Sequence, residues 1–182
     1  MRRLKEKIHR CQKILDDLPG ADLSRERQER LRDEDKEILE QKIGEVIGLE
    51  KAAQAAVEEL SAKGLLDKGG IKDKLQSMKK QASSHQSNLE GFVQALSESE
   101  GLSSMNIQEA AQETEQKAAD IMKIYLGENP DSSEAIEFLC LAEGGEVTHY
   151  EVLNALTKGV KNKKFGTKVR AILAEEKRHL QL

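Results

Sequence analysis

The chain has 182 residues, of which 37% are hydrophobic and 34% are charged, so it is long enough for one domain with a buried core. Its net charge of −4 argues against a nucleic-acid-binding surface, and without a long uncharged apolar run we expect neither a membrane-spanning helix nor a secretory signal. The two cysteines, Cys11 and Cys140, form no CxxC motif, which argues against a disulfide framework and a zinc site.

Proline occurs only twice and aromatic residues make up only 3% of the chain, a composition that favours long helices and an all-α fold. The first predicted helix covers residues 3–18, and its apolar residues recur at steps of three and four: Leu4, Ile8, Cys11, Leu15 and Leu18. The second helix is very polar and runs from about residue 24 to residue 63. Because an interior glycine costs about 1 kcal/mol relative to alanine, Gly44 and Gly48 indicate a kink in this helix.

We place a domain boundary near Gly44, so the sequence predicts a helical hairpin over residues 1–43 and a second domain over residues 44–182. The second domain begins with the end of the glycine-containing helix and holds four more predicted helices: 72–96, 107–126, 134–157 and 167 to the end. The serine-rich residues 97–104 and the basic residues 159–166 are predicted to be loops. Two helical pairs with short turns, joined by a crossover helix, indicate a four-helix bundle.

Each of the four bundle helices carries carboxylate or imidazole side chains within an otherwise apolar seam. These candidate residues are Glu50, His85, Glu146, His149, Glu176 and His179. A buried charge without a partner is strongly unfavourable, so such intrusions in four helices need a common reason. If the helices pair as antiparallel hairpins, the candidates lie at similar depths, and we expect them to converge in one layer.

Two pairs of candidates share the spacing Glu-x-x-His, namely Glu146 with His149 and Glu176 with His179. This spacing places a carboxylate and an imidazole one turn apart on the same helix face, where they can bind one metal ion or bridge two. The same spacing also suits a solvated ion pair, and His85 also suits a hydrogen-bonded core histidine.

Other polar residues near the seams have simpler interpretations. Glu143 and Glu151 flank the seam by one turn and are expected at its rim, although Glu143 becomes a ligand if its helix is rotated. Tyr150 is interpreted as a packing residue. A third Glu-x-x-His pair, Glu6 with His9, lies off the apolar stripe of its helix and is expected at the surface.

Four stretches of the second domain form a recognisable pattern: Glu50-Lys51, His85 with Leu89-Glu90-Gly91, Glu146-Val147-Thr148-His149-Tyr150-Glu151 and Ala174-Glu175-Glu176-Lys177. With this pattern, the chain from about residue 49 onward resembles the ferritin-like family of small bacterial proteins that includes YciE and YciF. The resemblance implies a ferritin-like four-helix bundle with a crossover helix, often dimeric, and a di-iron or di-manganese site. The ligands that it implies are Glu50, Glu146, His149 and Glu176. Ala82 departs from the family's pattern, because ferritin-like proteins generally place a glutamate three residues before this histidine.

The N-terminal segment contains a second pattern: Ile14-Leu15-Asp16-Asp17-Leu18-Pro19-Gly20-Ala21-Asp22-Leu23-Ser24-Arg25-Glu26-Arg27-Gln28. It is similar to the helical hairpin of subunit nine of the Mediator complex, over residues 4–46. This second resemblance implies a nuclear scaffold protein whose hairpin packs on partner helices.

No motif for nucleotide binding or acyl transfer occurs in the chain. The sequence therefore predicts a ferritin-like protein that binds iron or manganese, with oxidation of Fe(II) by oxygen or peroxide and a role in stress response. We expect it in the cytoplasm, as a homodimer or bound to a helical protein through residues 1–43, with no nucleic-acid or membrane partner. The alternative is a non-catalytic helical interaction protein, cytoplasmic or nuclear, whose seam residues only pair with one another.

Overall fold

The computed structural model describes residues 32–67 and 70–180, so the predicted helix at residues 3–18 lies outside the described range. The described residues form five α-helices and a short 3-10 helix without any strand, which confirms the predicted all-α class. Their bounds are α2 (Asp33–Ala62), α3 (Lys72–Glu100), α4 (Ser104–Leu126), α5 (Ser132–Leu156), η1 (Thr157–Gly159) and α6 (Lys163–His179). Over the described range, no helix combines the length and apolar character that a membrane crossing requires.

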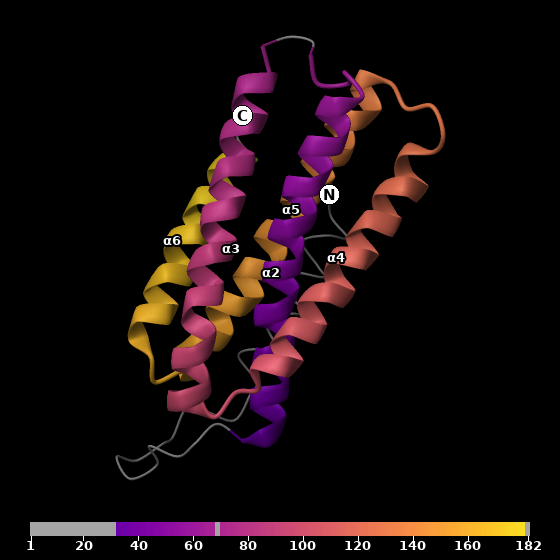
Figure 1. Cartoon of the computed structure of the whole chain (residues 1–182). Helices are drawn as coiled ribbons and strands as arrows, with labels where there is room; N and C mark the ends of the chain where they lie inside the picture. The colour runs from indigo at the N-terminus through magenta and orange to yellow at the C-terminus, as the bar shows by residue number, and fades with distance from the viewer. Residues whose placement is uncertain (1–31, 68–69, 181–182) are drawn as a thin grey trace, which may run out of the picture. The chain divides into compact units, whose positions relative to one another are not determined.

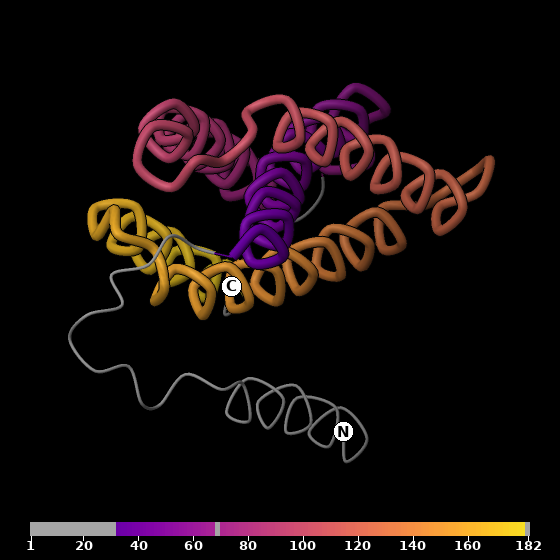
Figure 2. Tube along the Cα trace, turned by 90° about the horizontal axis from the view of Figure 1, so that it is seen from below, coloured from indigo at the N-terminus to yellow at the C-terminus, as the bar shows by residue number. Residues whose placement is uncertain are grey.

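Successive α-helices run in opposite directions along a common axis (Figure 1). Four of them form a closed ring, in which α2 contacts α3, α3 contacts α6, α6 contacts α5 and α5 contacts α2. The remaining helix, α4, packs mainly on α2 and carries the chain from the end of α3 to the start of α5. Viewed along the helices, α2 lies between α4 and α5 (Figure 2). Side chains from all four ring helices can therefore meet at the centre of the ring.

Two predicted loops are shorter than the sequence suggested, because helices extend into them. Helix α3 continues to Glu100, and within it the Ser97 hydroxyl donates a hydrogen bond of 3.0 Å to the Val93 carbonyl. Gly101 then ends α3 in the left-handed conformation, with a φ of 76°. Helix α6 begins at Lys163 because the Asn162 side chain caps it.

Gly44 and Gly48 lie inside α2, where they allow α4 to approach closely. A Cβ atom added at Gly44 would lie 2.5 Å from the Cβ of Ala110, and one added at Gly48 would lie 2.4 Å from the carbonyl oxygen of Ala111. No side chain fits at such distances, so these glycines serve helix packing. As the sequence predicted, one continuous helix runs through both glycines, and it crosses the position near Gly44 where we placed a domain boundary.

The domain division is corrected accordingly. Residues 33–43 form the first turns of α2, and two of their side chains, Leu39 and Ile43, are buried in the core. The compact unit that contains α2 spans Leu31–Leu182. The first arm of the predicted hairpin lies outside the described residues and stays a prediction.

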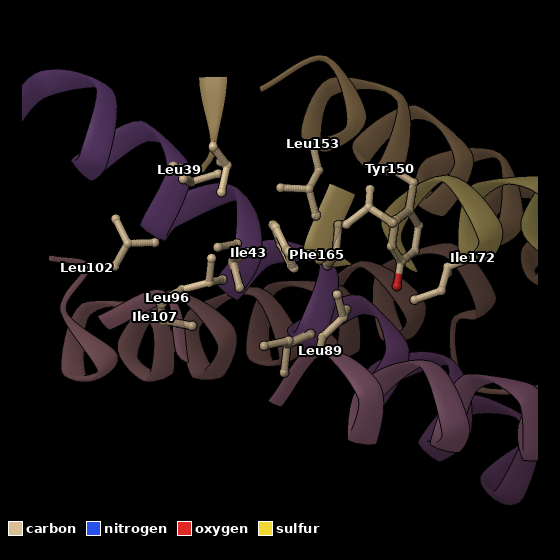
Figure 3. Packing of buried hydrophobic residues seen from close by; sticks show 14 of the residues in the cluster. Leu39, Ile43, Leu89, Leu96, Leu102, Ile107, Tyr150, Leu153, Phe165 and Ile172 are labelled. Carbon is tan, nitrogen blue, oxygen red and sulfur yellow. The ribbon is translucent and has the colours of Figure 1, made fainter. Parts of the chain in front are cut away.

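The buried apolar side chains form two separate clusters. The first comprises Leu39, Ile43, Val46, Ile47, Leu89, Leu96, Leu102, Ile107, Ala111, Tyr150, Leu153, Val160, Phe165, Val169, Ile172 and Leu173, and Figure 3 labels ten of them. The second comprises Ala56, Val57, Leu60, Leu66, Leu75, Met122, Leu126, Ala135, Phe138 and Leu139. On α2 the first cluster ends at Ile47 and the second begins at Ala56, so apolar packing is interrupted between them.

Candidate functional site

A layer of buried polar side chains lies between the two apolar clusters. Each ring helix contributes one member: Glu50 on α2, His85 on α3, Glu146 on α5 and Glu176 on α6. None of the four is more than 3% exposed. These residues are termed the polar layer, and all four belong to the set of six that the sequence predicted to converge.

His85 contacts three carboxylates through its two ring nitrogens. Its Nδ1 lies 3.2 Å from Oε1 of Glu50 and 2.7 Å from Oε1 of Glu176, and its Nε2 lies 2.9 Å from Oε2 of Glu175. A carboxylate only accepts hydrogen bonds, so both nitrogens carry a proton and the ring is an imidazolium cation. The side chain of Glu175 is 38% exposed, and His85 therefore links the buried layer to the surface.

Glu176 contacts one imidazole through each of its oxygens. Whereas Oε1 faces His85, Oε2 accepts a hydrogen bond of 3.2 Å from Nδ1 of His179. The same His179 nitrogen lies 3.2 Å from Oε2 of Glu143, and the other ring nitrogen contacts Gln81 on α3. Glu176 is therefore the carboxylate shared by two Glu–His groups.

Glu146 faces other carboxyl groups instead of a cation. Burial raises the pKa of Glu146 well above its ordinary value, and the charges of Glu50, Glu176 and Glu143 raise it further. The proximity of the Glu176 side chain also raises the pKa of Glu146. This side of the layer is therefore crowded with carboxyl groups that hold a proton.

The remaining members of the network titrate far from their ordinary values. Burial raises the pKa of Glu50 to about 7, against the opposing effect of its hydrogen bond with His85. Burial alone would raise the pKa of Glu176, but hydrogen bonds from His179 and His85 outweigh it and lower that pKa to about 2. Burial alone would lower the pKa of either histidine, but the same carboxylate bonds raise it to about 10 for His85 and about 9 for His179. Without metal, two imidazolium cations thus neutralise the layer at pH 7.

The two oxygens of Glu50 have different surroundings. Oε1 accepts a hydrogen bond of 2.5 Å from the Tyr150 hydroxyl and also faces His85. Oε2 is buried and has no hydrogen-bond partner among the described residues. An unsatisfied buried acceptor is unfavourable by about 1–3 kcal/mol, which a bound cation would remove.

Two other buried carboxylates show what a purely structural role looks like in this fold. Glu40 accepts hydrogen bonds from the Ser103 N–H at 2.6 Å and from the Asn106 side chain at 2.7 Å, at the start of α4. Glu100 accepts hydrogen bonds from the N–H groups of Lys161 and Asn162, at 2.9 and 3.2 Å. Neither carboxylate contacts another acidic group in these bonds. The crowding of carboxyl groups in the polar layer is therefore a different arrangement.

Of the two predicted residues that are not members of the polar layer, His179 contacts the layer through Glu176, whereas His149 lies outside it. Its side chain is 35% exposed, its Nδ1 donates a 2.9 Å hydrogen bond to the Gly145 carbonyl of its own helix, and its Nε2 lies 3.5 Å from Glu45. A three-residue step turns a side chain by about 60° around the helix axis, and on α5 this step carries His149 away from the ring centre, whereas on α6 His179 stays against Glu176. On α5, Tyr150 occupies the inward position instead and is fully buried.

Three contacts of the network were not predicted from the sequence: those of Glu175, Gln81 and the Tyr150 hydroxyl. Glu175 belongs to the Ala174–Lys177 stretch that carried the resemblance, but it lies outside the apolar seam. Gln81 also lies outside the apolar seam of its helix, so its position in the sequence does not indicate a buried contact. Glu143 was expected at the rim, and the structure places it against His179.

Two sets of side chains have the geometry to hold metal ions. Glu50, His85 and Glu176 form one set, and Glu143, Glu176 and His179 form the other, with ligand atoms that lie within 4.8 Å of one another in each set. A pocket borders the second set, and its lining combines Glu143, Glu146, Glu176 and His179 with small side chains that include Ala82 and Ala142. The pocket is a place where a small molecule can reach these carboxylates.

Comparison with known protein families, with curated proteins and with solved structures finds no match to this chain.

Proposed function

We propose that the polar layer, together with Glu143 and His179, binds two iron or manganese ions in a ferritin-like bundle. The observation that carries this proposal is the position of Glu176, whose two oxygens belong to two different Glu–His sets. A carboxylate in that position can bridge two cations. A purely structural ion pair needs only one set.

The donor chemistry of the layer supports the same assignment. Carboxylate oxygens and imidazole nitrogens are ligands that suit iron and manganese, and the layer contains no thiolate that would favour a softer metal. Oε2 of Glu50 is a buried acceptor without a partner, and Glu146 is a carboxyl kept neutral by its neighbours. Both groups gain a favourable interaction if cations enter the layer.

Bound iron would supply the redox chemistry, in which two Fe(II) ions each lose one electron and O₂ takes up both electrons with two protons as H₂O₂. The chain's residues hold the ions and exclude bulk water, because the four layer residues are buried. The pocket beside Glu143 and His179 is the route by which a small oxidant would approach the layer, since Glu143, Glu146, Glu176 and His179 all line it.

Occupation by metal requires that protons leave His85 and His179, because a nitrogen that binds a metal carries no proton. The two imidazolium cations act as substitutes for the metal charges in the metal-free protein. The alternative function is that of a non-catalytic helical interaction protein. It is favoured by the contacts of His85, which pairs with three carboxylates without a metal.

The proposal includes expectations about the setting of the protein. It acts in the cytoplasm in the response to metal or peroxide stress, and it pairs with a second copy or with another helical protein through residues 1–43. The resemblance to the YciE and YciF proteins, which are often dimeric, supports pairing with a second copy.

Anaerobic titration of the metal-free protein with Fe(II) or Mn(II) tests the proposal. We expect two ions per chain in the wild type, weaker binding and a lower ratio in Glu176→Gln, and wild-type binding in the control His149→Gln. Exposure of the iron-loaded protein to air should then give Fe(III) absorbance faster than iron in buffer. A wild type that binds neither ion more strongly than Glu176→Gln would leave the interaction-protein function in its place.

A further inference from the structure

Tyr150 is the only described tyrosine that reaches the polar layer. It lies on α5, one turn after Glu146, and is fully buried. Figure 3 shows it at one end of the labelled apolar residues, with its hydroxyl oxygen as the only polar atom of the side chain. The ring packs in the first apolar cluster, whereas the hydroxyl donates its hydrogen bond to Oε1 of Glu50 at 2.5 Å.

The side-chain carboxylate of Glu50 makes all its hydrogen bonds through one of its two oxygens. Oε1 accepts from Tyr150 and faces Nδ1 of His85 at 3.2 Å, while Oε2 is buried without a partner. A carboxylate with two equivalent oxygens could rotate or bind a metal through both. The bond from Tyr150 removes that equivalence, because rotation of the carboxylate would break it.

His85 cannot perform this role once it binds a metal. Its Nδ1 is the nitrogen nearest to both Glu50 and Glu176, and a metal bound between these residues takes the position of the proton on that nitrogen. The hydroxyl of Tyr150 has no such conflict. Its proton lies in the hydrogen bond to Oε1 of Glu50, and a phenol keeps its proton at neutral pH, so the hydroxyl remains a donor.

We propose that Tyr150 is a positioning residue for the metal site, whose hydrogen bond to Oε1 of Glu50 fixes the orientation of this carboxylate beside His85 and Glu176. This inference rests on the proposed metal-binding function. Outer-shell hydrogen bonds to ligating carboxylates commonly fix ligand orientation and tune metal affinity.

The test uses Co(II) as the probe, because its visible absorption depends on the number and geometry of its ligands. Metal-free wild type, Tyr150→Phe and Tyr125→Phe are titrated with Co(II) under identical conditions. The chain has only two tyrosines, and Tyr125 is exposed on α4 with its ring against Phe138, so Tyr125→Phe is a matched control for the loss of a hydroxyl. Thermal melts in the presence of a chelator establish that each variant folds.

We expect Tyr150→Phe to keep its fold, since the ring is retained, and to bind Co(II) roughly 10–100-fold more weakly, with a changed absorption spectrum. Tyr125→Phe should match the wild type in both respects. If Tyr150→Phe folds and matches the wild type in affinity and spectrum, the positioning role is wrong while the metal site stands. If the wild type shows no Co(II) spectrum that depends on Glu176, the metal site and the positioning role fail together. If Tyr150→Phe does not fold, Tyr150 is a structural residue and the inference is overturned.

Discussion

Oε1 of Glu176 lies 2.7 Å from Nδ1 of His85, and both side chains are buried between helices α6 and α3. This contact places a negative and a positive charge at the centre of a core that is otherwise divided into two apolar clusters. Removal of one partner from such a pair leaves the other charge buried and uncompensated. The contact therefore sets the stability of the metal-free protein as well as the geometry of the proposed site.

Replacement of two layer glutamates by glutamine should have opposite effects on the metal-free protein. Glu176→Gln removes the partner of His85 and His179, so we expect a loss of about 3–5 kcal/mol in the free energy of unfolding. Glu146→Gln replaces a carboxyl that is already neutral, so the metal-free variant should be at least as stable as the wild type. Urea unfolding with a chelator measures both values. A large loss in Glu146→Gln would show that its carboxyl is charged and paired.

The stability of the metal-free protein should fall as the pH rises above 6.5. The pKa values of His85 and His179 are raised from 6.5 to about 10 and about 9 by folding, so their contribution is complete below pH 6.5 and is lost as the pH rises through those values. The pKa of Glu176 is lowered from 4.5 to about 2, so its contribution is present above pH 4.5 and is lost as the pH falls through 2. The pKa of Glu50 is raised to about 7, so its contribution to stability is also lost as the pH rises from 4.5 to 7.

We therefore expect the highest melting temperature of the chelated protein between about pH 4.5 and pH 6.5. Melting curves at a series of pH values check this expectation. A melting temperature that rises steadily from pH 6 to pH 9 would contradict the assignment of two imidazolium cations.

Substitution of glycines should separate close helix packing from helix propensity. Gly48→Ala introduces a Cβ 2.4 Å from the Ala111 carbonyl, so α2 and α4 must move apart, at a cost of about 1–3 kcal/mol. The control is Gly91→Ala on α3, where the added Cβ has no neighbour within 4 Å and the better helix propensity of alanine stabilises by about 0.5–1 kcal/mol. Equal melting temperatures for the two variants would mean that the α2–α4 contact is looser than the structure has it.

Truncation should identify the start of the folded unit. A variant that lacks residues 1–30 keeps every described helix and should melt cooperatively with wild-type helix content. A variant that lacks residues 1–43 loses Leu39 and Ile43 from the core, and each such loss costs about 2–5 kcal/mol out of a typical 5–15 kcal/mol. Circular dichroism and binding of a hydrophobic dye measure the difference. A well-folded 44–182 fragment would restore the boundary predicted from the sequence.

Local signals in the sequence were sufficient for the helices and for several of their ends. The capping box of Asp131 and Glu134 begins α5 close to the predicted start at residue 134, and Gly127 follows the predicted end of α4 at residue 126. The contact of Gly48 with α4 is different in kind. From the sequence alone, a glycine that permits the close packing of two helices cannot be distinguished from a glycine that weakens a single helix.

The candidate site was predicted to the extent that helical periodicity determines which side chains face inward. Glu50 and His85 are the only polar candidates in their seams, Glu176 shares its seam with His179, and the structure brings Glu50, His85 and Glu176 together. His149 and Tyr150 are neighbours on α5, and a small rotation of the helix decides which of them is buried. That rotation depends on packing against three other helices, so the sequence of α5 does not determine it.

The most direct test of the metal site is the melting temperature of the wild type with excess Mn(II), compared with that in a chelator. A ligand that binds only the folded state adds about 2.7 kcal/mol of stability at 100 times its Kd, which corresponds to roughly 5–10 °C for a protein of this size. We expect such an increase in the wild type and in His149→Gln, a much smaller one in Glu176→Gln, and a larger one at pH 8 than at pH 6, because Mn(II) competes with protons for His85 and His179. A wild-type melting temperature that is the same with Mn(II) and with chelator would contradict the metal site and leave the polar layer as a set of paired charges.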